Sequence, residues 1–445
     1  MTKTAKHGMQ KRKNKALPKA KNQIAWAFQH SDNVVVNRIS QRAMVTEAFY
    51  ERFLSYFTSE GEGKDIQNRL TWLHRLPLIS TDGTDDALVL ALQATASAYC
   101  AVDSSNPALT RHAWNLYGDA LRIHGRTVAR STSKHQVTLH MVSTSVLFSF
   151  FEAMQATNAN AYRSHIFGAA KMLEVTGPGQ CTQGILCQIF YHLRTQMAFV
   201  HLTGNGNETP VEVRKILHGT LEYTRLPMFQ RLMSHIATLA EMYVEMRDGV
   251  INGTLHRPLN LGTYMAVKGE VEALWHEYTA SANERNEQLK WEDPSSGAPM
   301  YRDAFTALTI AYFESARVLL AIVAPQLAAS FVDLNDHYAA IMATAQYLQI
   351  HDIGCAYMRM ATPLLLVALH SPKREQRRAA IYCFECWAGG SMRGISTLAL
   401  QSIYRQRASK IPVDVRSAIA DTPSTVSSDD SSRYSDTRTI ETASD

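Results

Sequence analysis

Glycine and proline are scarce in this chain, with 22 and 14 residues among 445. Their scarcity disfavours a turn-rich sandwich or barrel and favours helices. The first 22 residues contain no acidic residue and no apolar segment of the kind that a signal peptide requires. The best candidate for a membrane span, residues 304–325, is interrupted by Glu314 and Arg317, short of the ~20 apolar residues that cross a bilayer. We therefore expect a soluble intracellular protein that does not span a membrane.

Cysteine is also scarce, and the six cysteines do not form a pattern that specifies a metal site. Cys383 and Cys386 make a C-x2-C pair, but a zinc site needs about four ligands, and no second pair follows. A redox pair would follow a strand and open a helix, whereas this one lies inside a helical pattern. We expect reduced thiols that act as small apolar side chains, at Cys100, Cys181, Cys187, Cys355, Cys383 and Cys386.

Other motifs of catalysis begin in the sequence but are not completed. His276 and Glu277 open a zinc-protease pattern, yet Ala280 stands where the second histidine belongs. Ser391 follows a glycine as in a nucleophile elbow, but Arg393 replaces the second glycine. The acidic cluster at 82–86 has no second cluster to share magnesium with it. The sequence thus predicts no catalytic residue, no metal and no cofactor, and a protein that is not an enzyme.

Glu152 and His165 stand among apolar residues and raise the question of an acid–base pair. Glu152 ends an apolar helical pattern, and His165 falls at the margin of the stripe that a helix over 161–175 would bury. We interpret the pair as structural, with the carboxylate holding a histidine or a helix N-terminus in place. Gly168 is expected to let a neighbouring helix approach closely.

Apolar residues recur at helical spacing from about residue 34 to residue 415. Thr84 and Asp85 are expected to cap a helix, Pro107 to lie in the first turn of one, and Pro77 to end one. No turn typical of a hairpin is flanked by alternating apolar residues, so no strand pair is expected. The prediction is an all-α array or bundle of about a dozen helices, including helices at 228–247, 262–285, 301–324, 336–352, 354–371 and 372–404.

The basic charge of the chain is concentrated in residues 1–33, which we predict to be a disordered arm. Its first 22 residues hold eight Lys and Arg, whereas the remaining residues include 37 basic and 40 acidic ones. The arm fits a nuclear import signal; the alternatives are contact with nucleic-acid phosphates without sequence preference and a merely solubilising terminus. The candidate import or phosphate-contact residues are Lys11, Arg12, Lys13, Lys15, Lys19 and Lys21.

A polar tail is expected at the other end, over residues 416–445. Residues 421–445 hold 12 Ser and Thr, six acidic residues and two arginines. This composition is typical of a disordered segment that is open to phosphorylation. Residues 34–415 would then form the folded helical domain between the arm and the tail.

The order of the predicted helices resembles that of the fungal-specific transcription factor domain, the helical regulatory region behind the binuclear zinc cluster of many fungal regulators. The similarity covers roughly residues 40 to 410. It rests on an Ala-rich helix, "LVLALQATASAYCAV", then a Tyr-x2-Ala-Leu helix at 117–121 and an aromatic-Glu pair at 151–152. A His-x2-Gly-Ala helix closed by Gly-Pro follows, carried by His165, Gly168, Ala169, Gly177 and Pro178.

This resemblance implies a nuclear transcriptional regulator, of the kind encoded in secondary-metabolite gene clusters. It departs from the family in one respect: the six cysteines of the family's DNA reader precede the helical domain, whereas the first cysteine here is Cys100. Either a partner supplies the DNA contact or the chain is truncated. The implied partners are other regulators or a second copy, with DNA contact at most nonspecific through the arm and a small-molecule effector possible between helices. The alternatives are an all-α enzyme of secondary metabolism and a non-nuclear helical scaffold.

Overall fold

The computed structural model describes residues 46–54, 72–80, 83–132, 137–158, 160–176, 181, 184–204, 211–218, 227–251, 260–324, 334–351 and 354–408. The chain divides into two units, Met1–Ala48 and Phe49–Asp445, and every described helix from Trp72 onward belongs to the second. The predicted arm and tail lie outside the described residues, and so do the six candidate import residues between Lys11 and Lys21.

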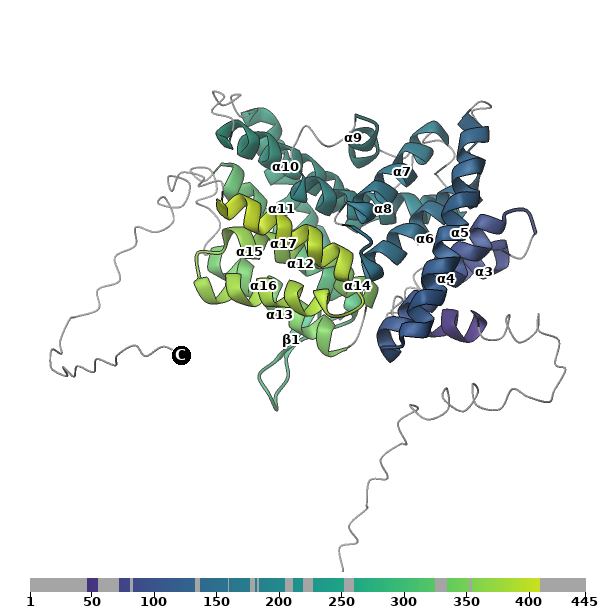
Figure 1. The fold of residues 1–445 in the computed structure, drawn as a ribbon. Coiled ribbons are helices and arrows are strands. Elements are labelled where there is room, and N and C mark those ends of the chain that lie inside the picture. Colours follow the sequence, from purple (N-terminus) through teal and green to yellow (C-terminus); the bar gives the residue numbers. More distant parts are fainter. Residues whose placement is uncertain are drawn as a thin grey trace, which may run out of the picture. The chain divides into compact units, whose positions relative to one another are not determined.

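Helices make up nearly all of the described part, which confirms the all-α prediction (Figure 1). The helices of the first half are α3 (Trp72–Ser80), α4 (Asp86–Ser104), α5 (Pro107–Thr132), α6 (Leu139–Gln155), α7 (Ala161–Thr176), α8 (Gly184–Thr203) and α9 (Val211–His218). Those of the second half are α10 (Met228–Ile251), α11 (Leu261–Glu284), α12 (Ala304–Val323), α13 (Leu334–Ile350), α14 (Gly354–Arg359), α15 (Ala361–His370), α16 (Arg374–Ala388) and α17 (Arg393–Ala408).

Side chains at the helix starts explain where several helices begin. The Asp85 carboxylate accepts a hydrogen bond of 3.0 Å from the Leu88 backbone N–H and so caps α4. Thr138 and Asp303 cap α6 and α12 in the same way. Helix α5 begins at Pro107, where the missing N–H has no intrahelical partner to lose. The predictions for Asp85 and Pro107 are thus confirmed.

Two helices, α6 and α12, lie in the core. Every residue of α6 from Met141 to Gln155 is buried, as is almost the whole length of α12. Helix α6 packs against α4 and α7, and α12 packs against α10 and α13. Helices α16 and α17 lie side by side, and α17 also contacts α6 (Figure 1). Buried apolar side chains from these helices join into one connected core.

Among the described residues, two helices are long and apolar enough to cross a membrane by length and composition alone: Asp86–Ser104 and Ala304–Val323. In an 18-residue apolar stretch of each helix, 67% and 94% of the residues are buried inside the protein. Core helices pass the same test. Glu314 and Arg317, the two charged residues that interrupt the second stretch, form an ion pair of 3.0 Å with each other on α12.

The prediction that the chain has no strand pair is wrong. Strands β1 (Lys290–Glu292) and β2 (Pro299–Tyr301) form an antiparallel hairpin with Trp291 opposite Met300, and the hairpin projects from the helices (Figure 1). Its turn is closed by the Asp293 carboxylate, which accepts hydrogen bonds from Ser295 and Ser296, and by Gly297 at a φ of 66°. Strands of three residues are too short to show an alternating pattern, so the sequence did not indicate them.

Pro77 does not end its helix, contrary to the prediction, because α3 continues through it to Ser80. A proline inside a helix removes the N–H that would bond to the carbonyl four residues earlier, here that of Leu73. The Tyr50 hydroxyl donates a hydrogen bond to this same Leu73 carbonyl. A residue 23 positions away thus supplies the partner that the proline removed.

The expected single helices over 354–371 and 372–404 are each divided in two. Helix α14 ends at Arg359 and α15 begins at Ala361, whereas α16 and α17 are separated by residues 389–392. Gly389 and Gly390 lie in this second break, and their N–H groups bond to the Cys386 and Trp387 carbonyls. The apolar pattern continues across both breaks, so the periodicity did not reveal them.

Candidate functional site

Glu152 and His165 meet through a third residue, Tyr117, which the sequence had indicated only as part of a matched helix motif. The Tyr117 hydroxyl, from α5, lies 2.6 Å from Glu152 Oε1 on α6 and 2.8 Å from His165 Nε2 on α7. Glu152 is 1% exposed and Tyr117 is 4% exposed. The tyrosine therefore links three helices in a buried position.

The geometry of this link indicates which atoms carry the protons. The Tyr117 hydroxyl donates to Glu152, so its oxygen accepts the Nε2–H of His165. Burial, with a smaller contribution from His124, lowers the pKa of His165 to about 4, which keeps the imidazole neutral at pH 7. Burial and the adjacent Glu152 carboxylate raise the pKa of Tyr117. The hydroxyl thus keeps its proton, and the link holds the helices without needing a charged histidine.

Glu152 has further partners in the turn that leads to α7. Its Oε2 accepts a 2.8 Å hydrogen bond from the Thr157 backbone N–H, and its Oε1 accepts a second one of 2.8 Å from the Thr157 hydroxyl. Ala156 takes a left-handed conformation in this turn, at a φ of 51°. The carboxylate therefore fixes both a tyrosine and the path of the chain after α6, and it reaches the histidine only through Tyr117.

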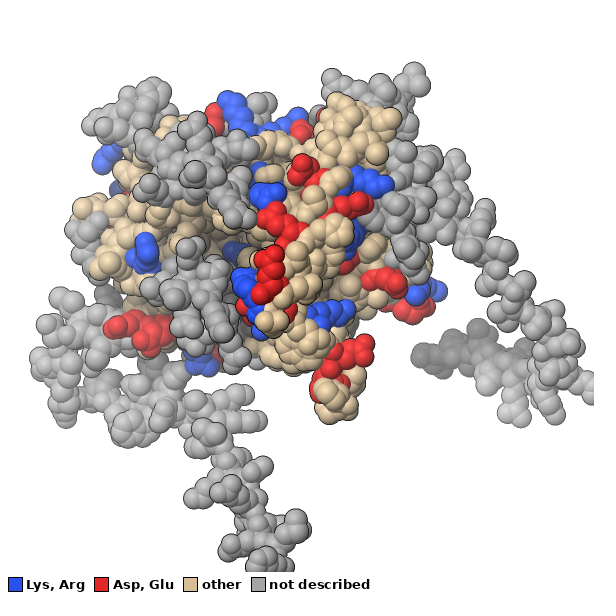
Figure 2. Space-filling model, turned by 180° about the vertical axis from the view of Figure 1, so that it is seen from behind, with Lys and Arg blue, Asp and Glu red and all other residues tan. Residues whose placement is uncertain are grey.

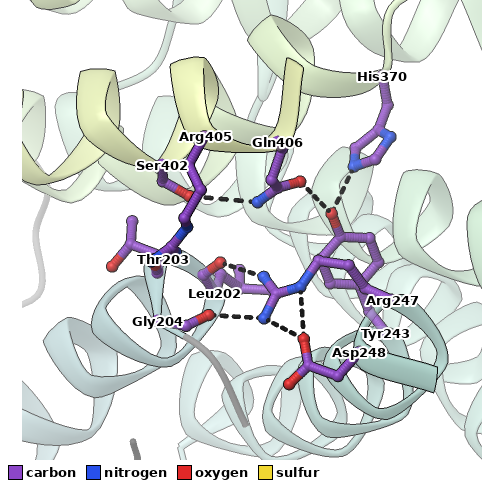
Figure 3. Close-up of polar contacts among 10 residues, drawn as sticks. All are labelled: Leu202, Thr203, Gly204, Tyr243, Arg247, Asp248, His370, Ser402, Arg405 and Gln406. Atoms are coloured by element: carbon purple, nitrogen blue, oxygen red, sulfur yellow. Dashed lines mark hydrogen bonds and ion pairs between the residues drawn. The ribbon is translucent and has the colours of Figure 1, made fainter. Parts of the chain in front are cut away.

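A second tyrosine, Tyr243 of α10, makes a similar link between α15 and α17 (Figure 3). Its hydroxyl donates to Gln406 Oε1 over 3.2 Å and lies 2.9 Å from His370 Nε2. Gln406 in turn donates to the Ser402 hydroxyl over 3.2 Å. Burial raises the pKa of Tyr243 to about 12, so this hydroxyl also keeps its proton at neutral pH.

Arginines cap the C-terminal end of α8 (Figure 3). Arg247, which is 3% exposed, donates to the Leu202 carbonyl over 2.9 Å and to the Gly204 carbonyl over 2.6 Å. Arg405 donates to the Thr203 carbonyl over 2.6 Å. Helix C-termini carry unsatisfied carbonyls and partial negative charge, so cations bound there stabilise the helix end.

A buried arginine also holds the end of α9. Arg194 is 1% exposed, and its Nε donates to the Leu217 carbonyl over 2.9 Å while Nη2 donates to the Ser234 hydroxyl over 2.8 Å. Burial lowers the pKa of Arg194 to about 10, which still leaves it charged at neutral pH. The sequence did not single out these arginines, because the carbonyls and the serine hydroxyl to which they donate lie far away along the chain.

The C-x2-C pair lies inside α16, as predicted, with Cys383 half-buried and Cys386 exposed. Cys100 and Cys181 are buried, and burial raises the pKa of Cys100 to about 12 and that of Cys181 to about 11. Among the described residues, no three His, Cys, Asp or Glu side chains come close enough together to hold a metal ion.

A pocket of about 470 Å³ opens where the N-terminal turn of α7, the end of α8 and one face of α17 meet. Two arginines, Arg163 and Arg405, lie in its wall. The residues that line it with them are Asn160, Ser164, Phe167, Thr203, Leu398, Gln401 and Ser402. This pocket has the volume of a small-molecule site. Its α17 residues lie one to three helical turns beyond Gly394, where α17 touches the Glu152 carbonyl of α6.

The described surface seen in Figure 2 carries basic and acidic side chains interspersed with one another. A nucleic-acid interface would gather Lys and Arg on one face, and this face does not do so. The candidate phosphate-contact residues of the arm, from Lys11 to Lys21, lie outside the described residues. Comparisons of the chain with models of known protein families, with curated proteins and with solved structures found no match.

Proposed function

We propose that this protein is a nuclear transcriptional regulator whose helical body is a platform for partners and for a small-molecule effector. The observation that favours a binding role over a catalytic one concerns Glu152 and His165. The residues best suited to acid–base chemistry both bond to one buried tyrosine, Tyr117, and Glu152 is 1% exposed. The helix order that resembles the fungal regulatory domain and the basic arm support the nuclear and transcriptional parts of the proposal.

DNA would be reached with the help of a partner. The first cysteine of the sequence, Cys100, is buried in α4, so the six-cysteine reader of the family that the sequence resembles is not among these residues. Another regulator that carries its own DNA reader would supply sequence-specific contact, whether or not the chain also pairs with a second copy of itself. The arm would add at most nonspecific attraction to phosphates.

Nuclear import is tested by neutralising the arm. We expect the fluorescently tagged chain to accumulate in the nucleus and a variant with Lys11, Arg12, Lys13 and Lys15 changed to Gln to spread through the cell. The matched control changes four exposed basic residues of the folded part to Gln, Lys290, Lys373, Arg374 and Arg378, and should stay nuclear. Nuclear accumulation that survives in the arm variant would contradict the import role.

The regulatory role is tested by deletion. Removing the gene should change the transcript levels of a set of genes, most of them in one metabolic cluster, and expressing the chain again should restore them. Expression of the Tyr117→Phe variant at equal protein level tests whether the intact body is needed. A transcriptome that does not change on deletion would contradict the proposal.

A further inference from the structure

The C-x2-C pair lies near the C-terminal end of α16, where it differs from the other thiols of the chain. Cys386 is exposed and Cys383 is half-buried. The other cysteines whose surroundings the structure describes are buried or half-buried. The pair therefore presents one thiol to solvent with a second thiol one helical turn before it, which is not the arrangement of small apolar side chains in a core.

The spacing of the pair brings the two thiols to one face of the helix. Residues three apart in an α-helix are neighbours on its surface, and helix geometry places their Cα atoms about 5 Å apart. This separation lies within the range of about 4.4–6.8 Å that disulfides span. Their Cβ atoms are roughly 5–6 Å apart in a regular helix and about 3.5–4.5 Å apart in a disulfide. The two sulfurs can therefore be joined once this turn tightens by about 1–2 Å.

The end of α16 is a place where a turn can tighten. Cys386 is followed by two more helical residues and then by Gly389 and Gly390. The N–H groups of these glycines bond to the Cys386 and Trp387 carbonyls over 3.2 and 3.0 Å, and the helix does not continue beyond them. The Trp387 ring packs edge-on against the Tyr357 ring of α14, with centroids 4.8 Å apart. A change in this turn would therefore reach a contact between two helices.

We propose that Cys383 and Cys386 form a reversible disulfide when a small disulfide such as glutathione disulfide oxidises the chain. The Cys386 thiolate attacks one sulfur of glutathione disulfide, which forms a mixed disulfide and releases one glutathione thiolate. The Cys383 thiolate then attacks the Cys386 sulfur and releases the second glutathione. Two thiols of the chain are oxidised, one glutathione disulfide is reduced to two glutathione molecules, and the two protons that the chain loses pass to them through water.

The order of the two steps and their reversibility follow from the surroundings of the thiols. Cys386 is exposed to a dissolved oxidant, whereas burial raises the pKa of the Cys383 thiol and so disfavours the thiolate that must attack. A disulfide that tightens a helical turn is strained, and strained disulfides are reduced more easily. We therefore expect the bond to open again when reduced glutathione predominates.

The test equilibrates the purified full-length chain in buffers of reduced and oxidised glutathione. Free thiols are then blocked with N-ethylmaleimide, and the chain is digested with trypsin. Cleavage after Arg378 and Arg393 leaves both thiols of the pair in one peptide, residues 379–393, which contains no other cysteine. We expect this peptide to carry two maleimides when reduced glutathione predominates. When oxidised glutathione predominates, it should carry no maleimide and no glutathione and have lost two hydrogen atoms.

The matched control moves one thiol to a position where it does not face the other. Cys386→Ser combined with Glu385→Cys keeps a thiol at an exposed position, but places it two residues from Cys383, where helical side chains do not face each other. We expect the value of [GSH]²/[GSSG] at which half of the peptide is internally oxidised to be at least about tenfold lower than in the wild-type chain. Circular dichroism would establish that both chains are folded.

Several results would overturn the proposal. They are free thiols in every buffer, Cys386 that stays joined to glutathione, Cys386 that pairs with a cysteine other than Cys383, and equal values for the wild-type chain and the control. None of them bears on the proposed function, because the disulfide is measured on the purified chain. Conversely, a reversible disulfide in a chain whose deletion leaves transcription unchanged would contradict only the regulator role.

Discussion

Tyrosine hydroxyls supply the partners that other buried groups need in this protein. Tyr117 and Tyr243 each lie between a histidine and an acceptor on another helix. Tyr50 bonds to the carbonyl that Pro77 leaves without its helical donor. A buried polar group without a partner lowers the stability of the fold by more than a typical hydrogen bond raises it. Removing one of these hydroxyls should therefore destabilise the fold by more than the net contribution of one hydrogen bond.

Replacing Tyr117 by Phe tests this at one residue. The change removes only an oxygen, but it leaves the buried Glu152 without one donor and the Nε2–H of His165 without its acceptor. We expect the free energy of unfolding to fall by about 1–3 kcal/mol, measured by urea denaturation at pH 7. Tyr382→Phe, at a side chain that is 66% exposed, is the matched control and should change stability by less than about 0.5 kcal/mol. Equal effects of the two changes would contradict the role of the hydroxyl.

The sequence indicated part of this arrangement. The sequence analysis interpreted Glu152 and His165 as structural polar residues, and in the structure both bond to Tyr117. Tyr117 was missed as their link, because it is 35 residues from one and 48 from the other. A tyrosine on an apolar stripe has the same pattern whether or not its hydroxyl meets a partner, so only the packing of α5 on α6 and α7 reveals it.

At the scale of helices, close packing occurs at Gly394 and not at Gly168, where we expected it. Gly168 has open space around it, with nothing within 4 Å of an added Cβ. Gly394 touches the α6 backbone. Both glycines stand in a helical pattern, so the sequence alone does not tell them apart. Which of them permits a close contact depends on the neighbouring helix.

The two glycines make a matched pair of substitutions. Gly394→Ala places a methyl group against the Glu152 carbonyl, so α17 must shift, and we expect a loss of about 1–3 kcal/mol. Gly168→Ala adds a better helix former in open space and should stabilise the chain by about 0.5–1 kcal/mol. Urea midpoints measure both. A Gly394→Ala variant as stable as Gly168→Ala would show that the contact between α6 and α17 is not tight.

The cap on α8 depends on the shape of a guanidinium as well as its charge. Arg247 reaches the Leu202 and Gly204 carbonyls at once, and it also bonds to Asp248. Lysine keeps the charge but lacks the planar fork, so we expect Arg247→Lys to lower the free energy of unfolding by about 1–3 kcal/mol. Arg378→Lys, at an exposed position, is the control. If both changes are neutral in urea denaturation, charge alone accounts for the cap.

The helices themselves were largely predictable, because long apolar periodic stretches with polar caps leave little choice of structure. The hairpin β1–β2 and the breaks after Arg359 and Ala388 were not. Each depends on a few residues, such as Gly297 in an exposed turn and Gly389 at a helix end, and such short features do not interrupt the apolar pattern of the sequence. The continuation of α3 through Pro77 was not predictable either, because the hydroxyl that bonds to the Leu73 carbonyl belongs to Tyr50, 23 residues away.

For the whole molecule, the neutral histidines in the core make stability depend on pH. Burial, with a smaller contribution from Arg359, lowers the pKa of His192 to about 3, and burial lowers that of His165 to about 4. In the unfolded chain a histidine titrates near about 6.5. Below that pH the unfolded chain binds protons that the folded chain does not, so stability is present above about pH 6.5 and is lost as pH falls toward the folded pKa values.

Each such histidine contributes about 1.4 kcal/mol per pH unit in this window. We therefore expect the free energy of unfolding to fall by a few kcal/mol between pH 7 and pH 5, measured by urea denaturation at several pH values. His192 lies stacked on Phe150, with ring centroids 5.2 Å apart, so His192→Phe keeps an aromatic ring there without a titrating group. Between about pH 6.5 and pH 5 its free energy of unfolding should fall less steeply with pH, by the ~1.4 kcal/mol per pH unit that one proton contributes. The curve of His112→Gln, at an exposed position, should run parallel to that of the wild-type chain. A His192→Phe curve parallel to the wild type would mean that the acid sensitivity of the fold comes from carboxylates rather than from its buried imidazoles.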